Sequence, residues 1–413
     1  MTEKNLNSQS GKGRPRGRKN KKTSTGYIAV IVLLLLVLIF SVVLIYRKIN
    51  SNTTDKINTE NESVSKIEDM EIAESETKET EVDDFGVEDA EGNIIETEYI
   101  EITVPETEAA RDEPIELLFG GDIYLSNYVL NAYDSAGGIN GVLCDNYLRE
   151  IEQSDMFIAN QEFPFSDRGE QAPDKQFTFR LSPERINIFT ELGLDLVTLA
   201  NNHSLDFGEA ALLDSIDVLD KASIKHMGAG KNKKEAMEPV IVEFKGRKIG
   251  FIAASRVIPV SSWAAGKDKP GLFICYDSAE LINSVKELES VCDYTIVFLH
   301  WGTEKKTVPD SYMEDMAENL VLSGADAVIG SHPHVLQPIE IINGKPVVYS
   351  LGNFIFGSRI ESTMLFKLII EDDKISYELL PGKGSMGYTQ MLSEPEKEAF
   401  IKAFPVSSRE IGN

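Results

Sequence analysis

The sequence predicts an α/β fold for the part of the chain that begins at about residue 115. Short runs rich in valine, isoleucine and leucine recur there, and segments with apolar residues at three- and four-residue spacing lie between several of them. Continuous apolar runs are typical of strands that are covered on both faces. Spacing of three and four is typical of helices that bury one face. The alternation of the two patterns therefore predicts strands and helices in one α/β domain.

The predicted elements follow from these runs in chain order. The segment 182–193 is a predicted helix, with Ser182 as its N-cap and Gly193 as its stop. Two further helices are predicted over 208–223 and 311–324. We expect the domain to end near residue 380, because the pattern of 381–413 is weak and suggests a C-terminal extension. The predicted strands are 115–119, 155–159, 194–200, 239–244, 248–254, 294–300, 325–330, 345–351 and 363–370.

Residues 47–114 form a predicted acidic linker. Between Asn50 and Glu116 there are 23 Asp or Glu residues against four Lys or Arg. Such a segment cannot bury enough apolar surface to offset the entropy of ordering it, so we expect a disordered, self-repelling stalk. A short strand is possible within 93–104, where apolar and polar residues partly alternate.

The segment from Tyr27 to Tyr46 is a predicted transmembrane helix. It carries no charge, and its length suits roughly 30 Å of hydrocarbon at about 1.5 Å per residue. A basic tail over residues 1–26 precedes it, so the positive-inside rule predicts a cytoplasmic N-terminus and an extracellular domain. A cleaved signal peptide is the alternative, but the following RKINSNTT lacks the small-residue pattern of a cleavage site. We therefore expect an uncleaved signal-anchor at the cell membrane.

Charge and cysteine content narrow the function classes. The formal net charge of −26 argues against nonspecific binding to nucleic acid. The three cysteines, Cys144, Cys275 and Cys292, are widely spaced and contain no C-x-x-C pair. They predict neither a disulfide framework nor a zinc finger, and we expect them to be buried apolar residues.

Four of the five histidines and two carboxylates come directly after predicted strands. Open α/β sheets hold ligand and catalytic sites at the carboxyl ends of their strands. Imidazole and carboxylate groups suit zinc, manganese or iron. The recurrence predicts one assembled metal site. Its residues are Asp122, Glu162, His203, His300, His332 and His334.

Taken singly, each of these clusters has a plainer interpretation. The Gly120-Gly121 pair before Asp122 indicates a tight turn that can approach a ligand, but such turns are common without one. Glu162 could be an ordinary loop glutamate, and Trp301 could simply pack beside His300 in the core. The metal-site prediction depends on the clusters occurring together.

The sequence Asn201-Asn202-His203 adds amide groups to an imidazole. The Asn202 oxygen can bind a metal, while Asn201 and His203 could instead satisfy backbone groups in a loop. Histidine serves as a general acid near neutral pH. Asp206, three residues further on, can orient His203 by accepting its second N–H. This spacing predicts a catalytic histidine beside the metal ligands.

The sequence His332-Pro333-His334 is the sharpest local signal. Residues two apart point in opposite directions on a regular strand and do not share a helix face, so both histidines can reach one site only from an irregular loop. Pro333 favours such a loop, and we expect it to hold His332 in an extended conformation.

Six motifs in this order resemble the CapA family of bacterial capsule and poly-γ-glutamate synthesis proteins, over about residues 115–370. That family looks like a branch of the calcineurin-like metallophosphoesterases. The resemblance implies a four-layer α/β/β/α sandwich with mixed sheets, and a membrane anchor before the domain also fits it. The motifs are Gly121-Asp122, Asn160-Gln161-Glu162, Asn201-Asn202-His203, His300-Trp301-Gly302-x-Glu304, Gly330-Ser331-His332-Pro333-His334-Val335 and Ser350-Leu351-Gly352-Asn353-Phe354.

The resemblance implies a role for each matching residue. His203 would be the general acid or the donor to a transition-state oxygen, with Asn201, Glu304 and Asn353 in support. In metallophosphoesterases, two ions about 3.5–4 Å apart polarise the phosphoryl group and activate a water. We therefore expect one or two divalent ions of Mn, Zn or Fe. The implied metal ligands are Asp122, Glu162, Asn202, His300, His332 and His334.

The chain departs from the metallophosphoesterase pattern at three of these positions. Tyr124 stands where those enzymes usually carry a histidine ligand, Glu162 replaces an aspartate, and Ser331 replaces a glycine. The change at Tyr124 removes one ligand, so the site could hold one ion or two weakly bound ions.

Three hypotheses for the function remain open at this stage. The first is a metal-dependent hydrolase or transferase, anchored outside the membrane, that acts in the making, attachment or export of an anionic surface polymer such as capsule or poly-γ-glutamate. The second is a non-enzymatic accessory protein that binds the polymer or components of its synthase. The third is a general extracellular metallophosphatase.

Overall fold

The computed structural model describes residues 113–357, 359–371 and 374–411, and the backbone of three short strands before them. These strands are β1 (Val87–Glu88), β2 (Ile94–Ile95) and β3 (Ile100–Thr103). The predicted basic tail, membrane span and most of the acidic linker lie outside these residues. Within the described part of the chain, no helix is long and apolar enough to cross a membrane.

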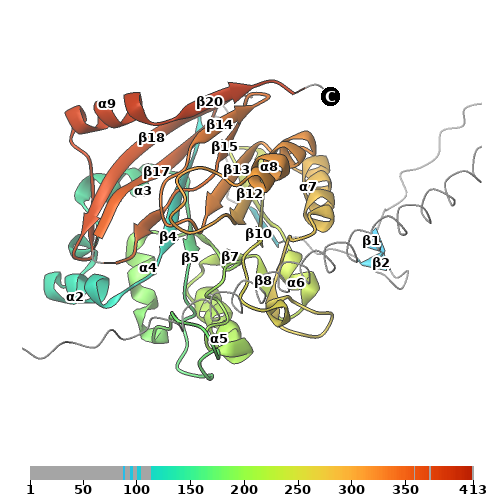
Figure 1. Cartoon of the computed structure of the whole chain (residues 1–413), viewed down its shortest axis with the longest axis horizontal. Coiled ribbons are helices and arrows are strands. Elements are labelled where there is room, and N and C mark those ends of the chain that lie inside the picture. Colours follow the sequence, from blue (N-terminus) through green and yellow to red (C-terminus); the bar gives the residue numbers. More distant parts are fainter. Residues whose placement is uncertain are drawn as a thin grey trace, which may run out of the picture. The chain divides into compact units, whose positions relative to one another are not determined.

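Two mixed eight-stranded sheets form the body of the domain (Figure 1). In the first sheet, β4 to β7 run parallel, and β17, β18 and β19 add antiparallel strands on the other side of β4. Its order is β19 (Tyr388–Met391), β18 (Lys374–Ser385), β17 (Arg359–Glu371), β4 (Ile115–Ile123), β5 (Met156–Gln161), β6 (Leu196–Thr198) and β7 (Lys225–Met227), with β16 (Asn353–Ile355) also paired with β4.

The second sheet has a parallel centre of β10, β12, β13 and β15, with antiparallel β9 and β14 beside it. A separate two-stranded sheet joins β8 (Ala229–Gly230) and β11 (Gly271–Leu272). The order of the second sheet is β20 (Val406–Arg409), β14 (Ile339–Ile342), β15 (Lys345–Val348), β13 (Ala327–Ser331), β12 (Tyr294–His300), β10 (Arg247–Ser255), β9 (Val240–Phe244) and β3.

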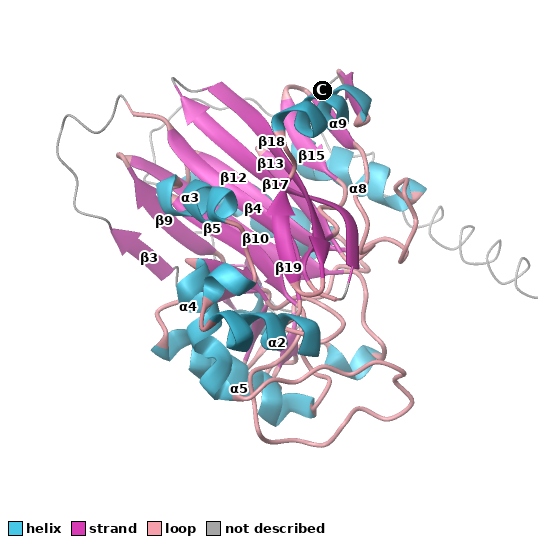
Figure 2. Ribbon diagram, turned by 90° about the vertical axis from the view of Figure 1, so that its left-hand side faces the viewer, coloured by secondary structure: helices cyan, strands magenta, loops and turns pink. Residues whose placement is uncertain are grey.

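The sheets pack face to face, and helices cover their outer faces (Figure 2). Along β4, Leu117 and Phe119 face the core between the sheets, whereas Leu118 faces the outer helices. This burial on both faces explains the continuous apolar runs. The α/β fold with mixed sheets is therefore confirmed. The outer helices are α2 (Asn127–Ala136), α3 (Asp145–Gln153), α4 (Ile186–Leu192) and α5 (Gly208–Lys221) on the first sheet, and α6 (Lys233–Met237), α7 (Ala279–Val291) and α8 (Ser311–Leu322) on the second.

The C-terminal residues are built into both sheets. The predicted domain boundary at residue 380 lies inside β18, and β20 pairs with β14 at the edge of the second sheet. Phe400 and Phe404, at α9 (Glu394–Ala403), pack against the core between the sheets. The apolar pattern is weak here because β20 is an exposed edge strand that needs few apolar residues.

Close backbone contacts fix the carboxyl end of β4. The glycine pair of β4 does not form the turn we expected, because the strand continues to Ile123 with a register shift between Phe119 and Asp122. A Cβ atom at Gly121 would lie 1.9 Å from the carbonyl oxygen of Gly352, and that oxygen accepts a hydrogen bond from the Asp122 amide at 2.8 Å. Glycine is therefore required for close packing rather than for a turn.

Replacing Gly121 with alanine should destabilise the domain. The added methyl group meets backbone that cannot move aside easily, and overpacking of this kind costs about 1–3 kcal/mol. The measurement is the unfolding midpoint of the full-length chain in urea. Gly357→Ala is the matched control, because its Cβ would meet nothing within 4 Å. Equal midpoints for both variants would contradict the proposed packing.

Candidate metal centre

The carboxyl ends of parallel strands from both sheets meet at one place. Asp122 lies near the end of β4, Glu162 follows β5 directly, and His300 ends β12. Side chains link the two sheets: His300 Nε2 lies 2.8 Å from Asn202 Oδ1, and His334 Nδ1 lies 3.0 Å from Asp122 Oδ2. The predicted strand-end residues are thus close neighbours in the structure.

His332 and His334 reach this place from a strained loop after β13. Both have positive φ angles, +96° and +57°, which are uncommon for residues with a Cβ atom. The expectation that Pro333 would hold His332 in an ordinary extended conformation is therefore wrong. The His300 and His332 ring centroids lie 4.7 Å apart, and those of His332 and His334 lie 5.9 Å apart. The strained backbone brings both imidazoles to one side of the loop, and strain of this kind clusters at functional sites.

Asn160 is a central residue of the site to which the sequence analysis assigned no role. It pairs in register with Asp122 across β4 and β5. Its Nδ2 atom donates to Asp122 Oδ1 at 2.8 Å and lies 3.2 Å from Glu162 Oε1. Its Oδ1 atom accepts a hydrogen bond from Asn201 at 3.0 Å. A buried amide at the end of an apolar strand was the signal that could have identified it.

Burial and mutual repulsion shift the titration of the cluster. Burial and the nearby Asp122 carboxylate raise the pKa of Glu162 well above its usual range. Burial lowers the pKa of His300 well below its usual range and that of His332 to about 3. Burial also opposes the charging of His334, but Glu162 and Asp122 outweigh it and raise that pKa to about 9. The hydrogen-bond donors of the cluster therefore do not fully stabilise the negative charges of Asp122 and Glu162.

Three buried ligand atoms of the cluster have no aligned hydrogen bond. They are Asp122 Oδ2, Glu162 Oε2 and His332 Nδ1, although His334 Nδ1 lies 3.0 Å from the first of them. Buried polar atoms are seldom left without a partner unless an ion or a water completes the site. Carboxylate oxygens and imidazole nitrogens are ligands of zinc, manganese and iron. The residues therefore fit a divalent cation.

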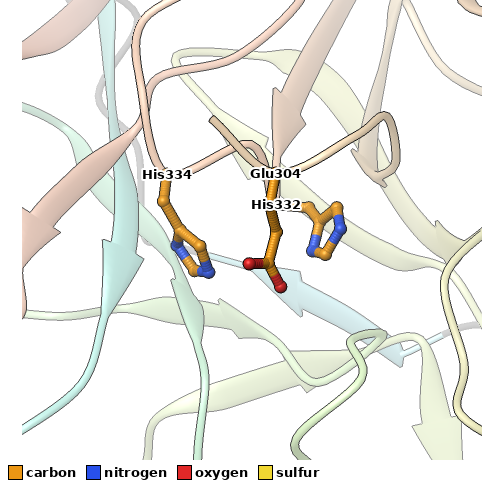
Figure 3. A group of neighbouring side chains, drawn as sticks. All are labelled: Glu304, His332 and His334. Carbon is orange, nitrogen blue, oxygen red and sulfur yellow. The ribbon is translucent and has the colours of Figure 1, made fainter. Parts of the chain in front are cut away.

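The potential ligands fall into two groups of three. One group is Asp122, Glu162 and His300, all buried. The other is Glu304, His332 and His334, in which Glu304 is exposed (Figure 3). Within each group the ligand atoms lie within 4.8 Å of one another.

Asn353 lies beside the second group. Its Oδ1 atom is 2.8 Å from His334 Nδ1 and so can orient that ring, while its supporting role stays a prediction.

His203 is held by Asp206 at the edge of the cluster. Its Nδ1 atom lies 2.7 Å from Asp206 Oδ2, which assigns the ring proton to Nδ1 and leaves Nε2 as the acceptor. Burial lowers the pKa of His203 even though Asp206 opposes this shift. Lys175, which the sequence analysis did not identify, forms an ion pair with Asp206 and donates to the backbone carbonyl of Asn202. The Phe179 ring stacks on the imidazole at a centroid distance of 4.2 Å.

Tyr124 belongs to an aromatic cluster beside these residues. Its ring stacks on Phe179 at a centroid distance of 3.9 Å and meets Phe356 edge-on at 5.4 Å. Burial raises the pKa of its hydroxyl group. The tyrosine therefore packs in the aromatic cluster beside His203.

A separate cavity of about 550 Å³ lies at the opposite, amino ends of β4 and β5. Its lysines are already paired, Lys367 with Glu116 and Glu150, and Lys245 with Asp155. It contains none of the strand-end ligands and is not the metal centre.

Comparison with known proteins identifies a family match over most of the domain. The family model described as "Bacterial capsule synthesis protein PGA_cap" matches residues 116–358. The chain is 28% identical over 258 residues to the PGA biosynthesis protein CapA of Bacillus subtilis (strain 168). The aligned region covers 61% of this chain and 66% of that protein. The chain thus spans slightly less than two thirds of this relative.

Two further comparisons concern a mycobacterial protein and a solved structure. A probable polyglutamine synthesis accessory protein of Mycobacterium tuberculosis is 29% identical over 286 residues, covering 64% of this chain and 75% of that protein. The structure of the calcineurin-like phosphoesterase YfkN from Bacillus subtilis is 18% identical and covers 66% of this chain and 91% of that chain, with a TM-score of 0.37.

Adding Mn²⁺ or Zn²⁺ to the chelator-treated, full-length chain should raise its melting temperature. A ligand that binds only the folded state at 100 times its Kd stabilises it by about 2.7 kcal/mol. Asp122→Asn should remove most of this increase, because it weakens one of the buried ligands. His226→Ala is the control, since His226 pairs with Asp220 outside the cluster. A metal response that is unchanged in Asp122→Asn would exclude Asp122 as a ligand.

Proposed function

The chain belongs to the PGA_cap family of bacterial capsule synthesis proteins, and we propose that it acts in making or exporting an anionic surface polymer, such as poly-γ-glutamate, through a metal-dependent phosphoesterase-type site. The proposal draws on the names of its relatives, among them a PGA biosynthesis protein. The site would hydrolyse or transfer a phosphoester formed while the polymer is made or attached.

The observation that carries this proposal is the cluster of buried, incompletely bonded ligand atoms beside an oriented histidine. Asp122, Glu162 and His332 each have a buried atom with no aligned partner. His203 lies next to this cluster with its ring fixed by Asp206. A purely structural polar cluster would satisfy its own donors and acceptors.

Different residues of the site would bind the ions, position the ligands and transfer a proton. Divalent ions bound to the carboxylates and imidazoles would supply polarisation of a phosphoryl group and a lowered pKa for a bound water. Asn160 holds Asp122 through a hydrogen bond at 2.8 Å and so keeps the ligands in place before an ion arrives. With His203 Nδ1 beside Asp206, Nε2 is the ring atom that would carry a proton and pass it to a leaving oxygen.

Lys175 fixes the geometry of this acid. It binds Asp206 and the Asn202 carbonyl, so it holds the carboxylate that orients His203 against the loop that carries both Asn202 and His203. Because Asp206 shares its charge with Lys175, it stabilises a charged His203 less strongly. Since burial also lowers the pKa of His203, the ring must take up a proton at Nε2 before it can act as the acid.

We further propose that the domain is held outside the cell by the apolar span at residues 27–46. The basic residues before this span and the acidic linker after it support an anchor with a cytoplasmic N-terminus. This position would place the site where a surface polymer is assembled, next to components of its synthase.

The second candidate function is that of a non-enzymatic accessory protein. One relative is named as an accessory protein of polyglutamine synthesis. In that case the ions would bridge carboxylates of the polymer to the protein, and His203 would not be needed as a proton donor.

His203→Ala should lower the hydrolysis of p-nitrophenyl phosphate or bis(p-nitrophenyl) phosphate by about 10²–10⁴-fold, the usual range for a general acid or base. The metal content of the variant should remain that of the wild type. His226→Ala should keep full activity, because its ring lies outside the cluster. Full turnover by His203→Ala would refute the proposed acid.

Complementation separates the two candidate functions. In a strain that lacks the chain, a catalytic role requires that His203→Ala fail to restore the polymer. An accessory role allows the same variant to restore it.

Trypsin added to intact cells should release the domain into the medium. The acidic linker contains Lys56, Lys66, Lys78 and Arg111 as cleavage sites, all on the extracellular side of the proposed span. Immunoblots of the medium and the membrane fraction measure the release. A variant without residues 27–46 should stay protected inside the cell. A wild-type chain that is cleaved only after the membrane is permeabilised would contradict this topology.

A further inference from the structure

The ligand missing at Tyr124 raises the question of how a second ion could be held. The phenol ring packs against Phe179 and Phe356, so it does not replace an imidazole. Without another anionic group, the second ion would lie beside His332 and His334 with two neutral ligands. A carboxylate near these rings would restore the binding site.

We propose that Glu304 is this ligand: it binds the second ion directly, together with His332 and His334. This inference rests on the proposed metal centre and assigns its second position. It changes the expected role of Glu304 from a supporting residue to a metal ligand.

The first argument is geometric. One ligand atom each from Glu304, His332 and His334 lies within 4.8 Å of the other two. Ligand atoms about 2.0–2.2 Å from a tetrahedral ion lie roughly 3.5 Å from one another, so a closure of about 1 Å brings the three atoms to binding distance. Figure 3 shows the Glu304 carboxylate between the two imidazole rings.

The second argument is that the loop of Glu304 is fixed to the histidine loop. The Lys305 amide donates to the Pro333 carbonyl at 2.8 Å, which joins the two loops between their ligands. Gln337 Nε2 donates to the carbonyls of Lys306 and Val308 at 2.8 and 3.1 Å. Gly302 has a φ angle of +91°, which lets the chain turn back after β12. The backbone that carries Glu304 is therefore held next to the histidine loop.

Two members of this group, His332 and Glu304, offer ligand atoms without hydrogen-bond partners among the described residues. His332 is 4% exposed, and its Nδ1 atom has no hydrogen bond. Within the described part of the chain, the Glu304 carboxylate makes neither a hydrogen bond nor an ion pair. A carboxylate free of other partners, beside a buried unpartnered imidazole, is a donor set that zinc, manganese and iron accept.

The two ion positions would be neighbours that differ in how far their ligands are exposed to solvent. His334 Nδ1 lies 3.0 Å from Asp122 Oδ2, so the group with Glu304 adjoins the group with Asp122. Two-ion sites have separations of about 3.5–4 Å. The ligands Asp122 and Glu162 are buried, whereas Glu304 is exposed. The second ion should therefore exchange with solvent more easily than the first.

The test measures metal content rather than activity. The full-length chain is stripped with a chelator, titrated with Mn²⁺ by calorimetry and analysed by elemental mass spectrometry and electron paramagnetic resonance. The wild type should bind two Mn²⁺ ions with a spin-coupled spectrum. Glu304→Ala should bind one ion and give the spectrum of an isolated Mn²⁺. Asp122→Asn should weaken the other position.

Controls separate ligand loss from unfolding and from a change in surface charge. Glu314→Ala removes an exposed carboxylate from α8 and should keep two ions. The metal-free Glu304→Ala chain should unfold at the wild-type midpoint. If it does not fold, Glu304→Gln repeats the test with a neutral side chain of the same size.

The outcomes distinguish this inference from the proposed function. If Glu304→Ala keeps both ions and the coupled spectrum, Glu304 is not a ligand. If the wild type holds a single ion that depends on Asp122 alone, the second position does not exist, although the metal centre remains. A wild-type chain that binds no metal overturns both proposals.

Discussion

The structure depends on one electrostatic constraint, which is the burial of two carboxylates at adjoining strand ends. Asp122 and Glu162 are both 0% exposed, and among the described residues Asn160 donates to the first and lies within hydrogen-bond distance of the second. Buried charge without compensation is strongly destabilising, so the pair must retain a proton or bind a cation. Since metal binding can contribute directly to the stability of the folded state, the same ligands that would serve a reaction also set how firmly the strand ends are held.

The surrounding backbone is arranged to keep these ligands in place. Gly121 lies against the carbonyl oxygen of Gly352 because a side chain would not fit between them. Gly330 is similar, since a Cβ atom there would lie 2.1 Å from the Tyr349 carbonyl oxygen. That oxygen also accepts the Trp301 Nε1 hydrogen bond at 2.9 Å, so the residue next to His300 is fixed. Close packing thus supports the two strained histidines, whose conformations would otherwise relax.

The sequence predicted the parts of this arrangement that follow from strand periodicity, and it could not predict those that depend on three-dimensional contacts. His300 and Asp122 were identified because each ends an apolar run. Lys175 was missed because it lies in a polar segment without regular pattern, and only the fold brings it to Asp206. The positive φ angle of His332 could not be predicted from the sequence either, since the local preference of a residue before proline is an extended backbone. The C-terminal strand β20 was not predicted, because an exposed strand at a sheet edge lacks the apolar pattern of a buried one.

Charge decides how this protein could attract an anionic substrate under the proposed function. The chain has a formal net charge of −26, so its long-range field repels phosphates and polycarboxylates. Lys175 does not offset this repulsion locally, because its ammonium group is committed to Asp206 and to the Asn202 carbonyl. The attraction must therefore come from the ions themselves, so metal binding would control substrate binding as well as the chemical step.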